Sequence, residues 1–248
     1  MPRRGLTAAE IVVALVILGV LAALLLPAVQ QGTGPNTWRR DESRRNLKGL
    51  SLAAHNMASA SDGAAPPAFT VDAEGRPLHG WATFLIPGLR STAFYDTIDF
   101  AAAWDAPVQG DAFENTLPEF RIPRLEPIDG PHPSIDYAAN GRVLKVRPAD
   151  SPLTPTGSDG LFGAADGLGQ TLLFGEIVDA RPPWGRPGNV RDPAAGLNAP
   201  GGFGSPWVDG CQFTFCDGSA RFLSDDIAPE VLRALSTPAA GDQPGDAW

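Results

Sequence analysis

Residues 1–30 read MPRRGLTAAEIVVALVILGVLAALLLPAVQ. Two arginines stand near the start, a single carboxylate follows at Glu10, and the run from Ile11 to Val29 carries no charge. At a helical rise of ~1.5 Å per residue, a run of about 19 residues spans roughly 28 Å, close to the ~30 Å thickness of the hydrocarbon core of a bilayer. The stretch therefore predicts a transmembrane helix, which we place at residues 6–31.

A cleaved secretory signal also has a basic head and an apolar run, but its apolar core is usually ~7–15 residues long and precedes a small-x-small cleavage site. The run here is longer, lacks such a site, and has Glu10 at its head, where a signal core would not carry a carboxylate.

Two roles suit Glu10. It can form a capping box with Thr7 at the helix start, or it can pair with the amino terminus of another molecule in the membrane, where a lone charge is costly. The residues around Glu10 favour the second role.

The sequence RRGLTAAE at residues 3–10, followed by an apolar helix, resembles the class III signal of type IV prepilins. The resemblance implies that residues 1–5 are a leader peptide, and that a prepilin peptidase/N-methylase cuts between Gly5 and Leu6 and methylates the new amino terminus. It also implies that Glu10, as the fifth mature residue, guides assembly. The sequence departs from the family's pattern at Leu6, where phenylalanine is usual, and at the two alanines before Glu10, where Leu-Ile is usual.

The composition is that of an acidic, turn-rich protein with a core. Of the 248 residues 43% are hydrophobic, while 28 glycines and 25 prolines indicate many turns. The formal net charge is −9, and loss of the two leader arginines makes it −9 − 2 = −11, so we expect no nucleic-acid partner. Basic residues on the leader side predict a single-pass protein of the inner (cytoplasmic) membrane, with a cytoplasmic amino terminus and an extracytoplasmic head. Exposure at the cell surface stays open.

We expect an α+β fold, in which a pilin-like transmembrane helix is followed by a loop-rich, mostly antiparallel β head. Two glycines and a proline within residues 32–36 oppose helix formation, and a second helix is predicted over residues 37–59. Residues 32–63 are therefore assigned to a linker and this helix, and residues 64–236 to the extracytoplasmic head. The final stretch, residues 237–248, has no periodicity and is expected to be disordered.

The second helix begins with a cluster of five basic residues and two acidic ones. The cluster can be interpreted as a contact with anionic lipid head groups, and a solvated helix face explains it at least as well. The basic members are Arg39, Arg40, Arg44, Arg45 and Lys48, and the acidic members are Asp41 and Glu42.

Strands are expected in several parts of the head. Ala64 to Trp81 reads as strand, turn and strand, and Thr171–Val178 as one further strand. Residues 105–160 are rich in proline, glycine and aspartate, so we expect irregular structure there, with short strands near residues 135–138 and 143–146.

The clearest hairpin joins Cys211–Cys216 to Ser219–Leu223 through Asp217-Gly218, which suits a tight type I′ turn. In that register Phe213 faces Phe222 across the two strands. A disulfide between the two cysteines is disfavoured, because five residues of one strand at ~3.3 Å each put their Cα atoms about 17 Å apart. We therefore expect two small buried thiols.

Stretches along nearly the whole chain resemble a large family of uncharacterised prepilin-like proteins. It is the domain-of-unknown-function family that carries a processing-associated motif of histidine, nine residues and Asp-Gly. The matching stretches are residues 46–56, 66–69, 71–79, 81–89, 103–105, 166–167, 171–176 and 215–223. At the motif Asp217 and Gly218 are present, but Trp207 stands in place of the histidine. The resemblance implies location and architecture, and it implies no activity.

We do not expect an enzyme. The three histidines, His55, His79 and His132, have neither metal-ligand spacing nor a neighbouring nucleophile signature, and the glycines form no recognised phosphate loop. No catalytic residue, metal or cofactor is assigned. One alternative stays open, a calcium ion held by four carboxylates without an EF-hand pattern. These carboxylates belong to Asp209, Asp217, Asp225 and Asp226.

Two functions remain. The first is a non-enzymatic type IV pilin-like or pseudopilin-like structural subunit of a type II secretion or surface filament system. Its partners are the prepilin peptidase/N-methylase, inner-membrane lipid and identical or related pilin-like subunits.

The second function is that of a membrane-tethered extracytoplasmic module that binds a ligand or cell-wall polymer and does not polymerise. Four tryptophans could line its site, although packing in the core explains them better. These are Trp81, Trp104, Trp184 and Trp207. We favour the subunit.

Overall fold

The computed structural model describes Leu15 and residues 37–90, 93–153, 160–242 and 244–245. Apart from Leu15, the leader, transmembrane helix and linker predicted within residues 1–36 lie outside these ranges. The chain divides into two compact units, residues 1–39 and 40–248, and the architecture below is that of the second. Within the described ranges, no helix combines the length and the apolar character needed to cross a membrane.

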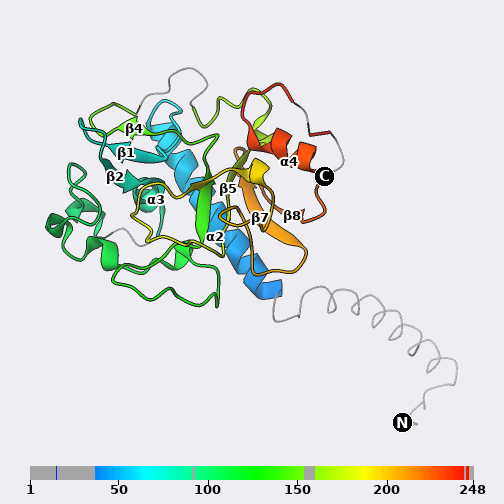
Figure 1. The fold of residues 1–248 in the computed structure, drawn as a ribbon, viewed down its shortest axis with the longest axis horizontal. Helices are drawn as coiled ribbons and strands as arrows, with labels where there is room; N and C mark the ends of the chain where they lie inside the picture. The colour runs from blue at the N-terminus through cyan, green and yellow to red at the C-terminus, as the bar shows by residue number, and fades with distance from the viewer. Residues whose placement is uncertain (1–14, 16–36, 91–92, 154–159, 243, 246–248) are drawn as a thin grey trace, which may run out of the picture. The chain divides into compact units, whose positions relative to one another are not determined.

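The long helix α2 (Thr37–Ala60) confirms the predicted second helix (Figure 1). Its buried side recurs every three or four residues, as expected for an amphipathic helix. This side is formed by Leu47, Leu50, Ala54 and Ala58, all 0% exposed. The helix ends where the amide of Gly63, at a φ of +90°, turns back to the carbonyl of Ala58 at 2.7 Å.

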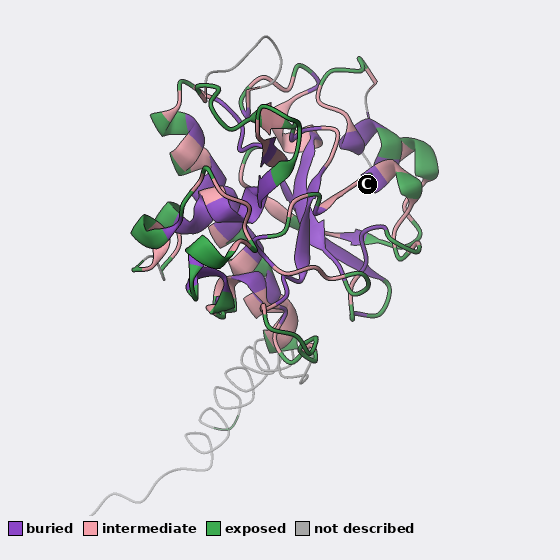
Figure 2. Ribbon diagram, turned by 60° about the vertical axis from the view of Figure 1, so that its left-hand side comes forward, coloured by how far each residue is buried: buried purple, intermediate pink, exposed green. Residues whose placement is uncertain are grey.

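A five-stranded sheet with the order β6-β3-β5-β7-β8 lies at the centre of the second unit. Its strands are β3 (Tyr137–Asn140), β5 (Leu172–Glu176), β6 (Val190–Arg191), β7 (Gly210–Phe215) and β8 (Ala220–Ser224). Strand β5 pairs antiparallel with β3 and with β7, and β7 pairs antiparallel with β8. Strand β6 joins β3 in parallel. Strands β5 and β7 are buried along their whole length (Figure 2), which explains why they consist of mainly apolar residues.

Helices cover both faces of this sheet. Phe174 and its neighbours on one face belong to the hydrophobic cluster that contains the buried side of α2. On the other face, Phe213 and Phe215 pack with Leu232 of helix α4 (Pro229–Ser236) in a second cluster. Phe213 and Phe215 share a face because side chains along a strand alternate between its two faces.

A three-stranded sheet with the order β2-β1-β4 is built from the earlier part of the head. Strands β1 (Phe69–Val71) and β2 (Pro77–Gly80) are antiparallel, and β4 (Arg147–Pro148) joins β1 in parallel. Helix α3 (Trp81–Leu85) follows β2 directly. Single turns of 3-10 helix are η1 (Ile86–Gly88), η2 (Tyr95–Thr97), η3 (Pro107–Gln109), η4 (Ala112–Glu114), η5 (Pro118–Phe120), η7 (Leu168–Gln170) and η8 (Pro193–Ala195).

Most of the predicted strands are confirmed, and one is wrong. Strands β1, β2 and β5 lie within the expected segments, and the strand expected near residues 135–138 is β3. Residues 143–146 form no strand. The amides of Val143 and Leu144 both donate to the carbonyl of Asn140, at 3.1 and 3.0 Å, which makes this segment a turn. Strand pairing resumes only at β4.

The hairpin of β7 and β8 is confirmed, but its predicted register is wrong by one residue. Phe213 lies opposite Arg221 instead of Phe222. The loop holds three residues, because the amide of Phe215 donates to the carbonyl of Ser219 at 2.9 Å. Within this fully described turn only Gly218 has a positive φ, +83°, whereas a type I′ turn needs two such residues.

The fold class is α+β, as predicted. Most strand pairs of the described residues are antiparallel, as expected, but both sheets are mixed because β4 and β6 each join a neighbour in parallel. The carboxy-terminal stretch also differs from the expectation of disorder over residues 237–248. The carboxylate of Asp166 accepts hydrogen bonds from the amides of Ala240 (2.7 Å) and Gly241 (3.0 Å). These contacts give residues 237–242 a defined course along the head.

Candidate functional site

The predicted processing site lies outside the described residues. It comprises Gly5, Leu6 and Glu10. The two motif residues, Asp217 and Gly218, form the turn between β7 and β8. Asp217 Oδ1 accepts a hydrogen bond from the amide of Ser219 at 2.8 Å, a contact typical of aspartate in turns. The structure therefore gives this pair a local role in closing the hairpin.

The hairpin turn also contacts α2. His55 on α2 lies within hydrogen-bonding distance of two carbonyls, that of Cys216 from Nε2 (3.0 Å) and that of Ser51 from Nδ1 (2.7 Å), and the neutral ring donates to one of them in each tautomer. A Cβ placed on Gly218 would lie 3.8 Å from His55 Cε1, so space allows one, but the φ of +83° favours glycine. His55, which showed no ligand spacing in the sequence, joins the hairpin to α2.

The carboxylate of Glu176, at the end of β5, has no exposed surface. Its Oε1 accepts hydrogen bonds from the hydroxyl of Ser43 on α2 and from Trp207 Nε1 (2.8 Å), and its Oε2 accepts one from the amide of Gln212 (2.8 Å). These three donors are uncharged. Burial raises the pKa of Glu176 to about 7, while the hydrogen bonds and the nearby Arg40 oppose the shift. Glu176 therefore changes protonation near neutral pH.

Ser43 connects Glu176 with the neighbouring strand. Its Oγ lies 3.1 Å from the hydroxyl of Tyr137 on β3, and that hydroxyl donates to the carbonyl of Arg121 at 3.2 Å. Burial and the adjacent Glu176 raise the pKa of Tyr137 well above its usual value, so the phenol keeps its proton.

The linked hydroxyl groups of Ser43 and Tyr137 can provide hydrogen-bond partners for both protonation states of Glu176, because each hydroxyl both donates and accepts. When Glu176 is ionised, Ser43 donates to the carboxylate and Tyr137 can donate to Ser43. When Glu176 is protonated, the carboxyl group can donate to Ser43, Ser43 to Tyr137, and Tyr137 to the carbonyl of Arg121. The site can thus hold or release a proton without leaving a hydroxyl unpaired.

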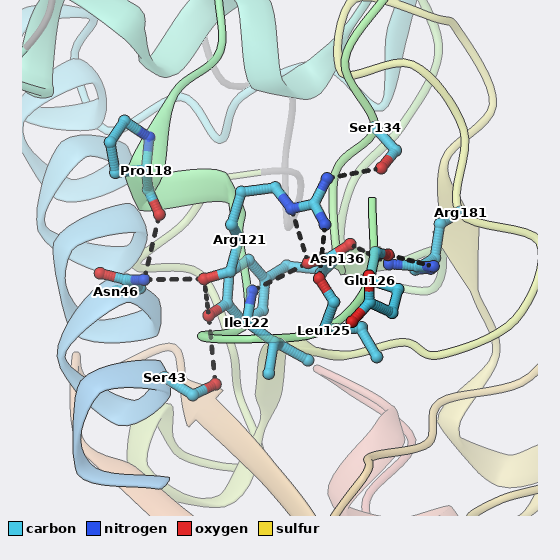
Figure 3. A network of polar contacts seen from close by, with 11 residues as sticks. Ser43, Asn46, Pro118, Arg121, Ile122, Leu125, Glu126, Ser134, Asp136 and Arg181 are labelled. Carbon is cyan, nitrogen blue, oxygen red and sulfur yellow. Dashed lines mark hydrogen bonds and ion pairs between the residues drawn. The ribbon is translucent and has the colours of Figure 1, made fainter. Parts of the chain in front are cut away.

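A second buried carboxylate, Asp136, directly precedes β3 and lies between two guanidinium groups (Figure 3). Arg121 Nε is 2.9 Å from Oδ2, and Arg181 Nη1 is 3.0 Å from Oδ1. The amide of Ile122 donates to Oδ2 at 2.9 Å. Burial raises the pKa of Asp136, and the two arginines and this amide oppose the shift. The two guanidinium groups thus favour an ionised Asp136.

The two arginines fasten the proline-rich segment that runs from η5 to β3. Arg121 donates to the hydroxyl of Ser134 at 2.9 Å, and Arg181 donates to the carbonyl of Glu126 at 2.9 Å. From the other side, Asn46 on α2 donates to the carbonyl of Arg121 at 2.9 Å. Figure 3 shows α2, this segment and the start of β3 joined in one polar network.

Trp207, at the position of the motif histidine, is 9% exposed, and its indole N–H points to Glu176. Because Trp207 precedes β7 and the Asp217-Gly218 turn follows it, the two parts of the motif lie at opposite ends of this strand. From the sequence, Glu176 is recognised only as part of a predicted strand, and Asp136 is not singled out. The sequence signal for a buried site was a carboxylate at the edge of an apolar run. A charge that such a run buries needs partners.

The cysteines and tryptophans are mostly core residues. Cys211 and Cys216 are free and buried, as expected, and burial raises the pKa of Cys216 to about 12. Of the four tryptophans considered for a ligand site, Trp104 alone is partly exposed, while the other three are buried. These four residues therefore do not form an open aromatic surface.

The four carboxylates considered from the sequence as a calcium site do not come together. Asp209 precedes β7 and Asp217 follows it, so these two carboxylates lie at opposite ends of a strand. Asp225 accepts a hydrogen bond from Asn198 Nδ2 at 2.8 Å. In the part of the chain that the structure describes, no group of three or more histidine, cysteine or acidic side chains is placed to hold a metal ion.

Comparison with known proteins identifies one family. The model of the family described as "Protein of unknown function (DUF1559)" matches residues 37–202, which is more than half of the chain. The matched range includes α2, Asp136 and Glu176, and it ends before Trp207 and the hairpin. No curated protein and no solved structure matches the chain.

Proposed function

We propose that this chain, which belongs to the DUF1559 family, is a non-enzymatic membrane-anchored structural subunit of the type IV pilin-like or pseudopilin-like kind. A prepilin peptidase/N-methylase cuts it between Gly5 and Leu6 and methylates the new amino terminus. Residues 6–31 then hold it in the inner membrane, with the head outside the cytoplasm. Glu10 pairs with the methylated amine of an identical or related subunit in a type II secretion or surface filament system.

The observation that carries the proposal is the RRGLTAAE signal, joined to an uncharged run that is followed within a few residues by α2. From residue 40 onward α2 is firmly fixed to the head. Ser43, Asn46 and His55 each make a hydrogen bond to a group outside the helix, in addition to its buried apolar side. From Arg40 on, α2 is therefore part of the head. The helix-opposing residues 32–36 favour a simple tether, and the prepilin-like signal favours the subunit and outweighs them.

The two buried carboxylates support a structural role over a catalytic one. Asp136 and Glu176 are both 0% exposed, and the oxygens of both accept hydrogen bonds from protein donors. A general acid or base must come within hydrogen-bonding distance of a substrate. Neither carboxylate is open to one in this conformation.

The first experiment is the intact mass and amino-terminal sequence of the protein recovered from its native membrane. We expect a mature chain that starts at Leu6 and carries one added methyl group. An uncut chain that begins at Met1 or Pro2 would contradict prepilin processing. In that case the tethered binding module would become the better account.

The second experiment compares Glu10→Ala with Glu114→Ala, which removes an exposed carboxylate of the head. We expect Glu10→Ala to remain in the membrane but to lose chemical cross-links between neighbouring subunits, because the methylated amine has lost its partner. Glu114→Ala should keep both properties. If the two variants cross-link equally well, Glu10 has no role in assembly.

The predicted orientation, with the head outside the cytoplasm, rests on the basic residues of the leader and needs its own measurement, because further basic residues follow the apolar run. Two arginines precede the run, and five basic residues follow it by position 48. The positive-inside rule counts charges within ~15–20 residues of a membrane helix. We expect protease added to spheroplasts to digest the head, as it would an extracytoplasmic domain. Protection of the head until the cells are lysed would place it in the cytoplasm.

A further inference from the structure

We propose that the outward side of the first turns of α2 is a docking surface for a bilayer with anionic lipid head groups. This basic face consists of Arg44, Arg45 and Lys48. The inference rests on the proposed membrane anchor, and it holds for either orientation of the head.

The basic face points away from the packed side of α2. Arg44 and Arg45 keep 49% and 66% of their side-chain surface exposed, and Lys48 is exposed as well. Leu52, one turn beyond Lys48, is 60% exposed. An apolar side chain beside basic ones is the pattern of helices that lie in the interfacial region of a bilayer.

The charge of this segment is opposite to that of the whole protein. Residues 37–48 contain five basic and two acidic side chains, which gives +5 − 2 = +3, whereas the complete chain has −9. The acidic members pair within the helix, Arg44 with Asp41 at 3.1 Å and Arg45 with Glu42. These exposed pairs are weak, and a guanidinium has five N–H donors, so each arginine can still bind a phosphate. Lys48 forms no ion pair with a described residue.

The position of the basic face along the chain explains why a bilayer is its partner. The uncharged run ends at Val29 and α2 begins at Thr37, so an extended connection spans at most about 27 Å. Attraction to anionic lipid acts within about a Debye length, ~8–10 Å, so a basic face this close along the chain to the proposed anchor can come within its range.

The test uses the full-length chain in vesicles of phosphatidylcholine, with or without phosphatidylglycerol. A donor dye on Val108→Cys, an exposed position, reports energy transfer to an acceptor lipid, and the two native cysteines are buried. We expect transfer to rise when phosphatidylglycerol is present and to return to the neutral-lipid value at high salt. In the triple variant Arg44→Gln/Arg45→Gln/Lys48→Gln the rise should be lost.

A matched control removes three exposed basic residues elsewhere on the head, Arg76→Gln/Arg186→Gln/Arg233→Gln, and should keep the rise. An equal response of both triple variants, or no rise in the parent chain, would overturn the inference. A rise that depends on the number of chains per vesicle would assign the basic face to the acidic surface of a second copy instead. Extraction of the chain from both kinds of vesicle by an alkaline wash would contradict the membrane anchor itself, which is the proposed function.

Discussion

Asp136 and Glu176 are both completely buried and lie close together, since Asp136 directly precedes β3, whose first residue, Tyr137, is paired with Glu176 on β5. Their surroundings differ in charge. Two guanidinium groups contact Asp136, whereas Glu176 is bonded by a hydroxyl, an indole N–H and a backbone amide. Burial raises the pKa of both, and for Glu176 it reaches about 7. Although the two carboxylates are equally buried, Asp136 therefore holds a loop in place through its ion pairs, whereas Glu176 can exchange a proton.

The largest effect is expected from Asp136→Asn. The substitution keeps the shape of the side chain but leaves Arg121 and Arg181, whose side chains are 17% and 10% exposed, without their buried counter-charge. Breaking one partner of a buried ion pair typically costs ~3–5 kcal/mol. Denaturant unfolding should show a loss of that size in the free energy of unfolding.

The control for this substitution is Asp192→Asn, at an exposed pair in which Arg142 Nε is 2.7 Å from the carboxylate. Exposed pairs contribute about 0–1 kcal/mol, so the control should be close to the parent chain. Similar losses for the two variants would show that burial of the Asp136 cluster does not determine its contribution.

The pH dependence of stability distinguishes the second carboxylate. Between pH 4.5 and about 7 the folded chain keeps a proton on Glu176 that an unfolded glutamate has released. Stability must therefore fall as pH rises through this window, by a few kcal/mol at ~1.4 kcal/mol per pKa unit. Unfolding curves recorded from pH 4.5 to 8 should show this decline, and Glu176→Gln should flatten it. An unchanged slope in the variant would mean that other groups cause the decline.

The sequence predicts what depends on local pattern and fails where distant residues meet. The three-to-four-residue spacing of Leu47, Leu50 and Ala54 is enough to predict α2, and Asp217-Gly218 between two strand-like runs is enough to predict the hairpin. The register of that hairpin depends on one hydrogen bond between Phe215 and Ser219, which composition does not reveal.

The candidate site is still less visible in the sequence, because its members are far apart along the chain. Ser43 and Glu176 are 133 residues apart, and Arg181 and Asp136 are 45 apart. The replacement of the motif histidine by Trp207 could be read directly from the sequence. The contact of Trp207 with Glu176 could not be read from the sequence, because it depends on how the loop before β7 folds back onto β5.

A smaller effect is expected from Trp207→Phe, which keeps an aromatic ring in the core and removes the N–H that bonds Glu176. A hydrogen bond to a charged group contributes ~1.5–3 kcal/mol, so a loss of about that size is expected at pH 8, where Glu176 is ionised. At pH 5 the loss should be smaller, because the protonated carboxyl depends less on this donor. Trp207→His, which restores the motif residue, should recover part of the difference because histidine also carries a ring N–H. A loss that is independent of pH, and that histidine does not reduce, would assign Trp207 to packing alone.

The smallest effect is expected from Ser43→Ala, and a second serine of α2 makes it interpretable. Ser43 and Ser51 are both 0% exposed, but the Ser43 hydroxyl bonds Glu176, whereas the Ser51 hydroxyl has no hydrogen-bond partner among the described residues. Removing Ser43 Oγ should cost ~1 kcal/mol and raise the pKa of Glu176 further, since a donor to its charged form is lost. Ser51→Ala should be neutral or slightly stabilising, because an unpaired buried hydroxyl is itself unfavourable. If both serines gave the same change, the uncharged donors would contribute no more than helix propensity, and the contrast between Glu176 and Asp136 would rest on the arginines alone.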